Sequence, residues 1–475
     1  MLFPPVPEQL SQLSIRNVLS FLGPGAVLAA ATIGSGELVF GSRNGAVFGY
    51  GLAWCFVWAG IFKGIQVYTA ARYLTLTGEH PMMRWREIPG PRGWFPLLLG
   101  VMSILVMPVA YSVIPKILST LTTHWFGLTK DDPQFVVMSK LAASAFLLSC
   151  FVFFILSSYS TLEKITLGLL LIMLFCIGVA VVMTFHNPLN LLFGILVPQV
   201  PDYEPWVTKK YPNFATRSPW EEVAVYLTAV GGGSYDYVGY IGMLREKCWG
   251  RSGAVSESKD GENILKELEA KTDQAAAEVK RARLWLRAPL IDCSLSFSFV
   301  IVISLLFVIL GAEILHPREL IPDSSQLLTV QESFLTLIHP SLKILYGAAV
   351  LLTFFGTLYG AFSVYTWTVF ETARSIWPTA TQLRLKAIQR FVLAYCVIGG
   401  LSLIWIDLEP VAVITLVAVL GGAPTCAAWC FAMLWTDRRF LPAPLRMGKG
   451  LKVMTIVAGV AMTVLGLKVL AAYFS

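Results

Sequence analysis

The chain has 475 residues, of which 56% are hydrophobic and only 14% are charged, and its mean hydropathy is +0.68. A soluble globular protein has about 45–50% apolar and about 25% charged residues. The composition therefore excludes a soluble enzyme, a nucleic-acid-binding protein and a secreted disulfide scaffold. The formal net charge of +7 does not indicate nucleic acid, because the basic residues flank apolar segments, as the positive-inside rule expects of a membrane protein.

In chain order, the apolar runs and the breakers between them predict an all-α polytopic membrane protein with about eleven transmembrane helices. We expect these helices near residues 19–44, 46–77, 94–117, 135–157, 162–185, 221–244, 288–313, 343–373, 388–407, 410–435 and 451–473. Lysine and arginine are concentrated in the loops that face the cytoplasm if the N-terminus lies inside. The predicted location is the plasma (inner) membrane, with lipid around the chain and a cytoplasmic N-terminus.

Two of the predicted helices contain glycine clusters at mid-membrane depth, each followed by a carboxylate. The first reads Gly34-Ser35-Gly36-Glu37, and the sixth reads Gly231-Gly232-Gly233-Ser234-Tyr235-Asp236. Glycine lowers the cost of unwinding a helix, and unwound backbone at membrane depth is tolerated only around a cavity. Corresponding interruptions in two halves of a chain point to a transporter's binding site. Close helix packing through small residues is the alternative, but packing does not explain the two carboxylates.

Glu37 and Asp236 are the leading candidates for binding a metal ion or a proton, because a carboxylate inside a span is expensive and is a functional candidate by default. They could coordinate a hard cation together with freed backbone carbonyls, or carry protons. Lys63 in the second span either counters the charge of Glu37 or extends toward a membrane edge. Further residues predicted to line the cavity are Gln66, Ser35, Ser234 and Tyr235.

Other charged residues are predicted to have structural roles. Asp292 follows Arg287 at the start of the seventh span, which favours a helix N-terminal charge or an interfacial ion pair. Glu371 and Arg374 end the eighth span and are predicted to pair at the cytoplasmic face. No histidine lies inside a predicted span, and the sequence has no nucleophile motif or phosphate loop, so that neither an enzyme nor a bound cofactor is predicted.

Several motifs resemble the Nramp family of proton-coupled divalent-metal transporters. Gly23-Pro24-Gly25 opens the first span before residues 34–37, residues 44–54 follow it, and residues 71–78 close the second span. Leu162-Glu163, residues 196–201, and Arg287 before Asp292 also fit. The similarity extends over most of the chain in order and spacing.

The resemblance implies the LeuT-type fold, in which two inverted five-helix repeats have their first and sixth helices unwound around a central site. The chain then divides into a first half-repeat at 1–185 and an extracellular connector at 186–220. A second half-repeat follows at 221–435, with a cytoplasmic loop at 245–287, and the final segment at 436–475 holds a loop and the eleventh helix. A surface helix with i,i+4 charge pairs is expected within 251–287, in a solvated connector.

The sequence departs from the family pattern at the residues that bind metal. Family metal transporters carry Asp-Pro-Gly-Asn at the first break, so that Gly34 takes the place of the metal-binding aspartate here and Glu37 that of the asparagine. At the sixth break, glycine and serine at 232–234 replace a Met-Pro-His stretch. The thioether that favours soft transition metals is therefore missing.

Two substrates stay open for the predicted secondary transporter, which works by alternating access. The first is a hard divalent cation of the Mg2+ class, bound by Glu37, Asp236 and neighbouring oxygens, in line with the ligands that Mg2+ prefers. The second is a small organic solute such as an amino acid or carboxylate, held by half-helix N-termini and Lys63 and coupled to H+ or Na+. The carboxylates favour the cation slightly. The coupling ion, the direction of transport and the oligomeric state are not given by the sequence.

Overall fold

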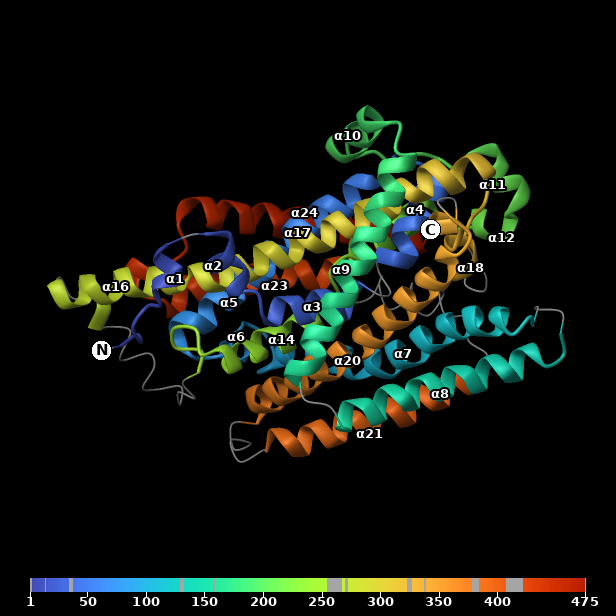
Figure 1. Ribbon diagram of the computed structural model, residues 1–475. Helices are drawn as coiled ribbons and strands as arrows, with labels where there is room; N and C mark the ends of the chain where they lie inside the picture. The colour runs from blue at the N-terminus through green and yellow to red at the C-terminus, as the bar shows by residue number, and fades with distance from the viewer. Residues whose placement is uncertain are drawn as a thin grey trace.

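The computed structural model describes residues 2–12, 14–33, 37–128, 132–156, 159–253, 267–269, 272–322, 327–336, 339–377, 384–406 and 422–474. Within these ranges all regular structure is helical. The long unbroken helices are α5 (Ala53–Thr77), α7 (Trp94–Trp125), α8 (Phe135–Leu156), α9 (Tyr159–Thr184), α17 (Arg287–Leu310), α20 (Leu342–Ile376), α21 (Leu385–Trp405), α23 (Ala423–Phe440) and α24 (Lys449–Phe474). Most of them run side by side along the long axis of the molecule (Figure 1).

The sixth predicted span is broken in the structure, and the first is described on either side of residues 34–36, which lie outside the described part of the chain. The first consists of α3 (Pro24–Ile33), a π-helical turn η1 (Glu37–Gly41) and α4 (Ser42–Phe48). The sixth consists of α13 (Pro219–Ala229) and α14 (Ser234–Met243), separated by the glycines. The other nine predicted spans coincide with long helices, except that the tenth is described only from Ala423, because residues 407–421 lie outside the described part of the chain.

Helix length and apolar composition alone identify fewer membrane spans than the eleven predicted from the sequence. Among the described residues, six helices are long and apolar enough to cross a membrane, or seven if Leu174–Thr184 and Pro188–Leu196, bent by 114°, form one span. The pieces α3, α4, α13 and α14 are each too short to cross a membrane alone. Helix α5 is less apolar because it carries Lys63 and Arg72. The protein is a multi-pass membrane protein.

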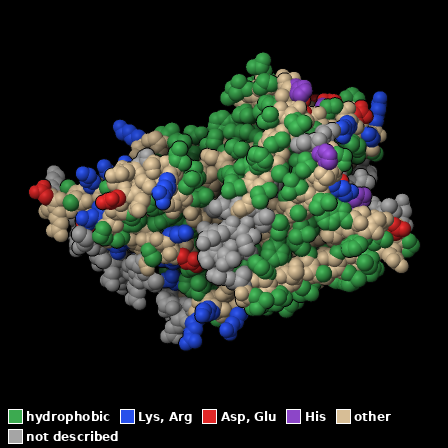
Figure 2. Space-filling model, viewed as in Figure 1, with side chains coloured by type: hydrophobic (Ala, Val, Ile, Leu, Met, Phe, Trp, Pro, Cys, Tyr) green, Lys and Arg blue, Asp and Glu red, His purple; other side chains and the backbone are tan. Residues whose placement is uncertain are grey.

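Shorter helices gather at the two ends of the bundle. One end carries α1 (Glu8–Ser11), α2 (Ile15–Ser20), α6 (Pro81–Trp85) and α16 (Asp273–Trp285), and the other carries α10 (Pro188–Leu196), α11 (Pro205–Lys210) and α12 (Pro212–Ala215) (Figure 1). Lys and Arg side chains gather at the α16 end, and apolar side chains cover the flanks of the long helices (Figure 2). The remaining short elements are η2 (Leu244–Lys247), η3 (Glu267–Glu269), η4 (Gly311–Leu315), η5 (His316–Arg318), α18 (Leu327–Gln331), α19 (Ser333–Thr336) and η7 (Ala443–Leu445).

The helix expected within 251–287 is α16, which begins at Asp273, where the side chain of Thr272 caps it. Residues 254–266, where part of that helix was expected, lie outside the described residues. The carboxylate of Glu278 accepts hydrogen bonds from the backbone N–H groups of Leu2 and Phe3, both at 3.1 Å. Instead of being only a solvated connector, this segment holds the N-terminal residues against the bundle.

Candidate functional site

Glu37, the first residue of η1, places a buried carboxylate opposite the break between α13 and α14. The residues Gly34, Ser35 and Gly36 lie outside the described part of the chain, which resumes at Glu37. Glu37 is completely buried, and its Oε1 accepts a hydrogen bond of 3.0 Å from the backbone N–H of Gly231. The carboxylate of Glu37 therefore satisfies a backbone group that the unwinding between α13 and α14 has freed.

The second break depends on glycine for its backbone conformation. Gly231 has φ +69° and Gly232 has φ +81°, a left-handed region that side chains with a Cβ rarely adopt. A Cβ on Gly231 would also lie 2.9 Å from the ring of Phe297 in α17. The oligoglycine thus allows α13 to end at Ala229 and α14 to start afresh at Ser234.

Lys63 points from α5 into this break. Its Nζ donates hydrogen bonds to the carbonyl oxygens of Thr228, Val230 and Gly232, at 2.7, 2.7 and 2.8 Å. The side chain is 2% exposed, so that of the two predicted placements the extension toward a membrane edge is wrong. Lys63 is instead held in the interior by carbonyl groups in the last turn of α13 and in the break after it.

Two side chains of the predicted set hold the start of α14. Asp236 Oδ2 accepts a hydrogen bond of 2.8 Å from the backbone N–H of Gly233, which makes Asp236 the cap of its own helix. Gln66, three residues after Lys63, donates through Nε2 to the hydroxyl of Ser234 at 2.8 Å. Tyr235 is buried in α14, and its carbonyl accepts a hydrogen bond from Thr368 of α20.

Two buried acceptors at this junction have no hydrogen-bond partner among the described residues. They are Oε2 of Glu37 and Oε1 of Gln66. A buried acceptor without a partner is expensive, so that both oxygens are available to a cation, a proton or a water molecule. In the described part of the chain, no three His, Cys, Asp or Glu side chains form a metal-binding group, and any metal here would depend on carbonyl, amide and hydroxyl oxygens as well.

Tyr237 belongs to the site although the sequence analysis did not single it out. Its hydroxyl donates to the carbonyl oxygens of Gly231 and Gly232, at 2.9 and 3.2 Å. The hydroxyl therefore supports the left-handed glycines from the α14 side. The available signal was weak, since a tyrosine one residue after Asp236 is equally typical of helix packing.

Asp292 has a different role from the predicted one. It is fully buried, and its two carboxylate oxygens accept hydrogen bonds from the backbone N–H groups of Gly23 and Gly25, both at 2.9 Å, and from Tyr240. Arg287 instead donates to the carbonyl of Leu10. The predicted interfacial pair is wrong, and the carboxylate binds N–H groups at the N-terminal end of α3 rather than of its own helix α17.

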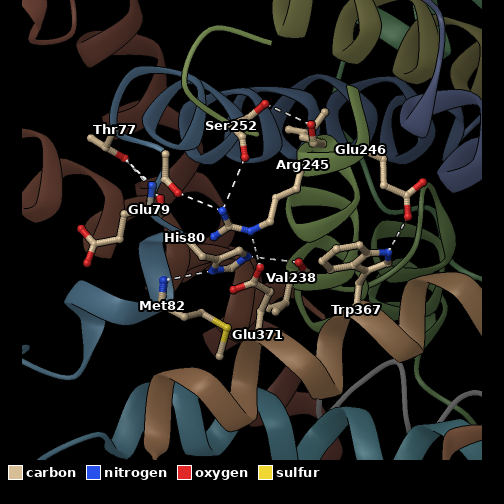
Figure 3. A network of polar contacts seen from close by, with 12 residues as sticks. Thr77, Glu79, His80, Met82, Val238, Arg245, Glu246, Ser252, Trp367 and Glu371 are labelled. Atoms are coloured by element: carbon tan, nitrogen blue, oxygen red, sulfur yellow. Dashed lines mark hydrogen bonds and ion pairs between the residues drawn. The ribbon is translucent and has the colours of Figure 1, made fainter. Parts of the chain in front are cut away.

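A second polar network closes the bundle at the far end of α14 (Figure 3). Arg245 in η2 forms an ion pair with Glu371 of α20, with 2.7 Å between Nε and Oε1, and also donates to the carbonyl of Gly78 at 2.9 Å. The predicted pair of Glu371 with Arg374 is wrong, since Arg374 lies over the ring of Phe370. This network joins α14, α20 and the end of α5.

His80 completes the network from the loop after α5. Its Nδ1 accepts the backbone N–H of Met82 at 3.2 Å and its Nε2 lies 3.1 Å from the carbonyl of Val238, which assigns the proton to Nε2 in a neutral ring (Figure 3). Burial lowers the pKa of His80 from 6.5 to about 4, with Arg245 acting in the same sense and Glu371 opposing it. The imidazole is therefore a neutral hydrogen-bonding link at ordinary pH.

The sequence is similar to known metal transporters over part of its length. No protein-family model matches it. Metal transporter Nramp2 of Oryza sativa subsp. japonica is 26% identical over 196 residues, which are 39% of this chain and 34% of the rice protein. Metal transporter Nramp3 of Arabidopsis thaliana is 29% identical over 200 residues, 39% of this chain and 35% of that protein. The match thus spans about a third of the length of these relatives.

The fold is similar to that of a solved transporter over nearly the whole chain. The crystal structure of the Eremococcus coleocola manganese transporter, in complex with an aromatic bis-isothiourea compound, aligns with a TM-score of 0.64. It covers 97% of this chain and 88% of that chain at 14% identity, a level at which the likeness concerns the fold. The predicted LeuT-type fold and the resemblance to the Nramp family are confirmed. These relatives are transporters, in agreement with the prediction that the chain is not an enzyme.

Proposed function

We propose that this Nramp-like chain is a secondary transporter that moves a hard divalent cation of the Mg2+ class by alternating access. The observation that carries the proposal is the position of Glu37, whose Oε1 bonds to Gly231 while Oε2 has no partner among the described residues. A buried carboxylate with an available oxygen, at the junction of two broken helices, suits a cation that crosses the membrane through the site.

The donor atoms at the junction favour a hard cation. Glu37, Asp236, Gln66 and Ser234 offer oxygen, and residues 228–236 contain no methionine, histidine or cysteine. Oxygen ligands suit Mg2+, whereas thioether and thiolate ligands suit softer metals. The curated relatives are named metal transporters and the solved neighbour a manganese transporter, which supports a divalent metal in general.

The contacts of Lys63 and Asp236 speak against the organic-solute alternative. All three N–H donors of Lys63 are used by carbonyls of the break, so that none is left for a substrate carboxylate. The N-terminus of α14 is already capped by the carboxylate of Asp236. The two anion-binding features that an amino acid or carboxylate would need are therefore both satisfied within the protein.

Alternating access assigns different roles to the two polar regions. Glu37 and Asp236 would bind the cation. The network of Arg245, Glu371 and His80 would keep the α16 end closed until the bundle formed by the first and sixth spans rocks away from α20. We further propose that this end faces the cytoplasm, since Lys and Arg gather there (Figure 2). The protein would then lie in the plasma membrane with its N-terminus inside.

The test is uptake into proteoliposomes that contain the purified protein and an ion-sensitive dye. We expect saturable entry of Mg2+ with no preference for Mn2+. Empty vesicles report leakage, and flux that does not saturate would indicate a channel. Preference for Mn2+ would contradict the assignment to a hard cation. Failure to move either ion, together with uptake of an amino acid or carboxylate, would overturn the proposal in favour of the organic solute.

A further inference from the structure

Three carbonyl groups at the end of α13 are arranged as a binding site for a single small cation. They belong to Thr228, Val230 and Gly232, and their oxygens lie 2.7, 2.7 and 2.8 Å from one point, which is the Nζ atom of Lys63. Carbonyls freed by an unwound helix, and the negative end of a half-helix, are where broken-helix transporters coordinate Na+ or protons. The chain thus contains the ligands of such a site and also its occupant.

The hydrogen bonds require that the occupant is charged. An ammonium group has three N–H donors and no acceptor, and here each donor faces a carbonyl oxygen. A neutral amine would direct its lone pair at one of these oxygens. The arrangement is therefore satisfied only by the protonated side chain, which is 2% exposed.

The occupant is also fixed in place. Lys63 and Gln66 are three residues apart on α5, so that they lie on one face of that helix, and Gln66 is hydrogen-bonded to Ser234 at the start of α14. One helix face therefore holds both ends of the break, with the ammonium at the end of α13 and the amide at the start of α14. A cation supplied in this way does not dissociate.

We propose that the carbonyls of Thr228, Val230 and Gly232 form a monovalent-cation site that Lys63 fills permanently, so that the protein needs no Na+ or K+ from solution to hold its sixth helix broken. Removal of the ammonium should then expose a site for a small monovalent cation. The inference concerns a site separate from the free oxygen of Glu37, and it stands whether or not the transported substrate is divalent.

The experiment measures thermal unfolding of the purified full chain in choline, Na+, K+ and methylammonium salts at constant ionic strength. The variants are Lys63→Met and the control Lys140→Met, which removes a half-buried lysine of α8 that donates to the carbonyl of Trp405. We expect the wild type and Lys140→Met to unfold at the same temperature in all four salts. Lys63→Met should unfold at a lower temperature in choline. At least one small cation should raise its unfolding temperature again, saturably and by several degrees.

Two results would overturn the proposal. One is saturable stabilisation of the wild type by Na+ or K+, which would mean that a monovalent cation binds while Lys63 is present. The other is a Lys63→Met variant that folds and is indifferent to all four cations. If Lys63→Met cannot be purified in any salt, Lys63→Arg and Lys63→Gln decide: the arginine variant should be recovered in choline, and the glutamine variant only with a small cation. Recovery of Lys63→Gln in choline would contradict the proposal. The readout does not involve transport, so that its failure is separable from failure of the proposed function.

Discussion

Glu37 and Gly231 are joined by a hydrogen bond of 3.0 Å between the carboxylate and the backbone N–H, and this contact links η1 to the break between α13 and α14. The carboxylate therefore has two functions that one substitution would confuse. It stabilises an unwound backbone, and under the proposed function it also binds the cation. A useful variant must keep the first function while it removes the second.

Asp236→Asn separates the same two functions on α14. The amide oxygen can still accept the N–H of Gly233, so that the helix start is preserved and the free energy of unfolding should change by less than about 1 kcal/mol. Because the charge is lost, we expect cation uptake to fall at least about tenfold. Asp236→Ala, which removes the cap as well, should also destabilise the protein by about 1 kcal/mol. Unchanged uptake in Asp236→Asn would restrict Asp236 to a structural role.

The ion pair of Arg245 with Glu371 should behave as one unit. Glu371 is almost fully buried, and removal of one partner leaves the other charge without compensation, which typically costs about 3–5 kcal/mol. We expect Glu371→Gln and Arg245→Met each to be strongly destabilising in a denaturant titration. The double variant should be destabilised by less than the sum of the two, with a coupling of about 0.5–3 kcal/mol. Additive effects would mean that the pair does not stabilise this end of the bundle.

His80 should make stability depend on pH. Its pKa is about 4 in the folded protein and 6.5 as the ordinary value, because burial disfavours the charged ring. The unfolded chain therefore binds the proton more readily, and the stability from the neutral ring is present above pH 6.5 and lost as the pH falls toward 4. The full loss is roughly 3 kcal/mol.

The measurement for His80 compares thermal unfolding of the wild type and His80→Asn across this pH window. Asparagine can still cap α6 but loses the contact with the carbonyl of Val238, so that the variant should be less stable at every pH. Because the titrating ring is gone, the pH dependence should become flatter. His339→Asn is the control, because His339 is exposed and its Nδ1 accepts the N–H of Ser341 in the same local geometry. Equal pH dependence in the wild type and His80→Asn would contradict the assignment.

Gly239 should tolerate no side chain, because α14 and α20 are in close contact there. A Cβ on Gly239 would lie 2.0 Å from the carbonyl oxygen of Val364, which is backbone and cannot rotate away. We expect Gly239→Ala to destabilise the protein by about 1–3 kcal/mol or more. Gly178→Ala in α9 is the matched control, because a Cβ there meets nothing within 4 Å and helix propensity favours alanine. The measurement is unfolding in a denaturant titration, and similar denaturation midpoints for the two variants would contradict the close contact of α14 with α20.

The sequence was sufficient to predict the helices and the break between α13 and α14, because both signals are local. The predicted break at residues 34–36 lies outside the described residues. The predicted starts at 94 and 135 agree with α7 and α8, and the glycines at 231 and 232 adopt the left-handed backbone that their composition suggests. The start of the tenth span at 410 could not be compared, since it lies outside the described residues. Local pattern also singled out Lys63 and Gln66, which the structure places at the break between α13 and α14.

Partners distant in sequence could not be predicted from the chain. Glu371 pairs with Arg245, 126 residues away, rather than with the nearby Arg374, and Asp292 binds N–H groups of Gly23 and Gly25 that only the packed bundle brings near. The hydrogen-bond partners of Lys63 are carbonyl groups whose directions depend on the φ angles of Gly231 and Gly232. In each case the deciding information was the position of free backbone groups, which residue identity does not specify.

If the transported cation passes the carboxylate of Glu37, Mg2+ uptake into proteoliposomes should depend on the charge of this residue. The variant that tests this is Glu37→Gln. Glutamine keeps an acceptor for Gly231 and removes only the charge. The control is Glu313→Gln in η4, where the carboxylate accepts a hydrogen bond of 2.7 Å from Tyr50, away from both breaks. We expect Glu37→Gln to fold and to lose saturable Mg2+ uptake, while Glu313→Gln retains it. Wild-type uptake in a folded Glu37→Gln variant would mean that the cation does not bind the charge of Glu37.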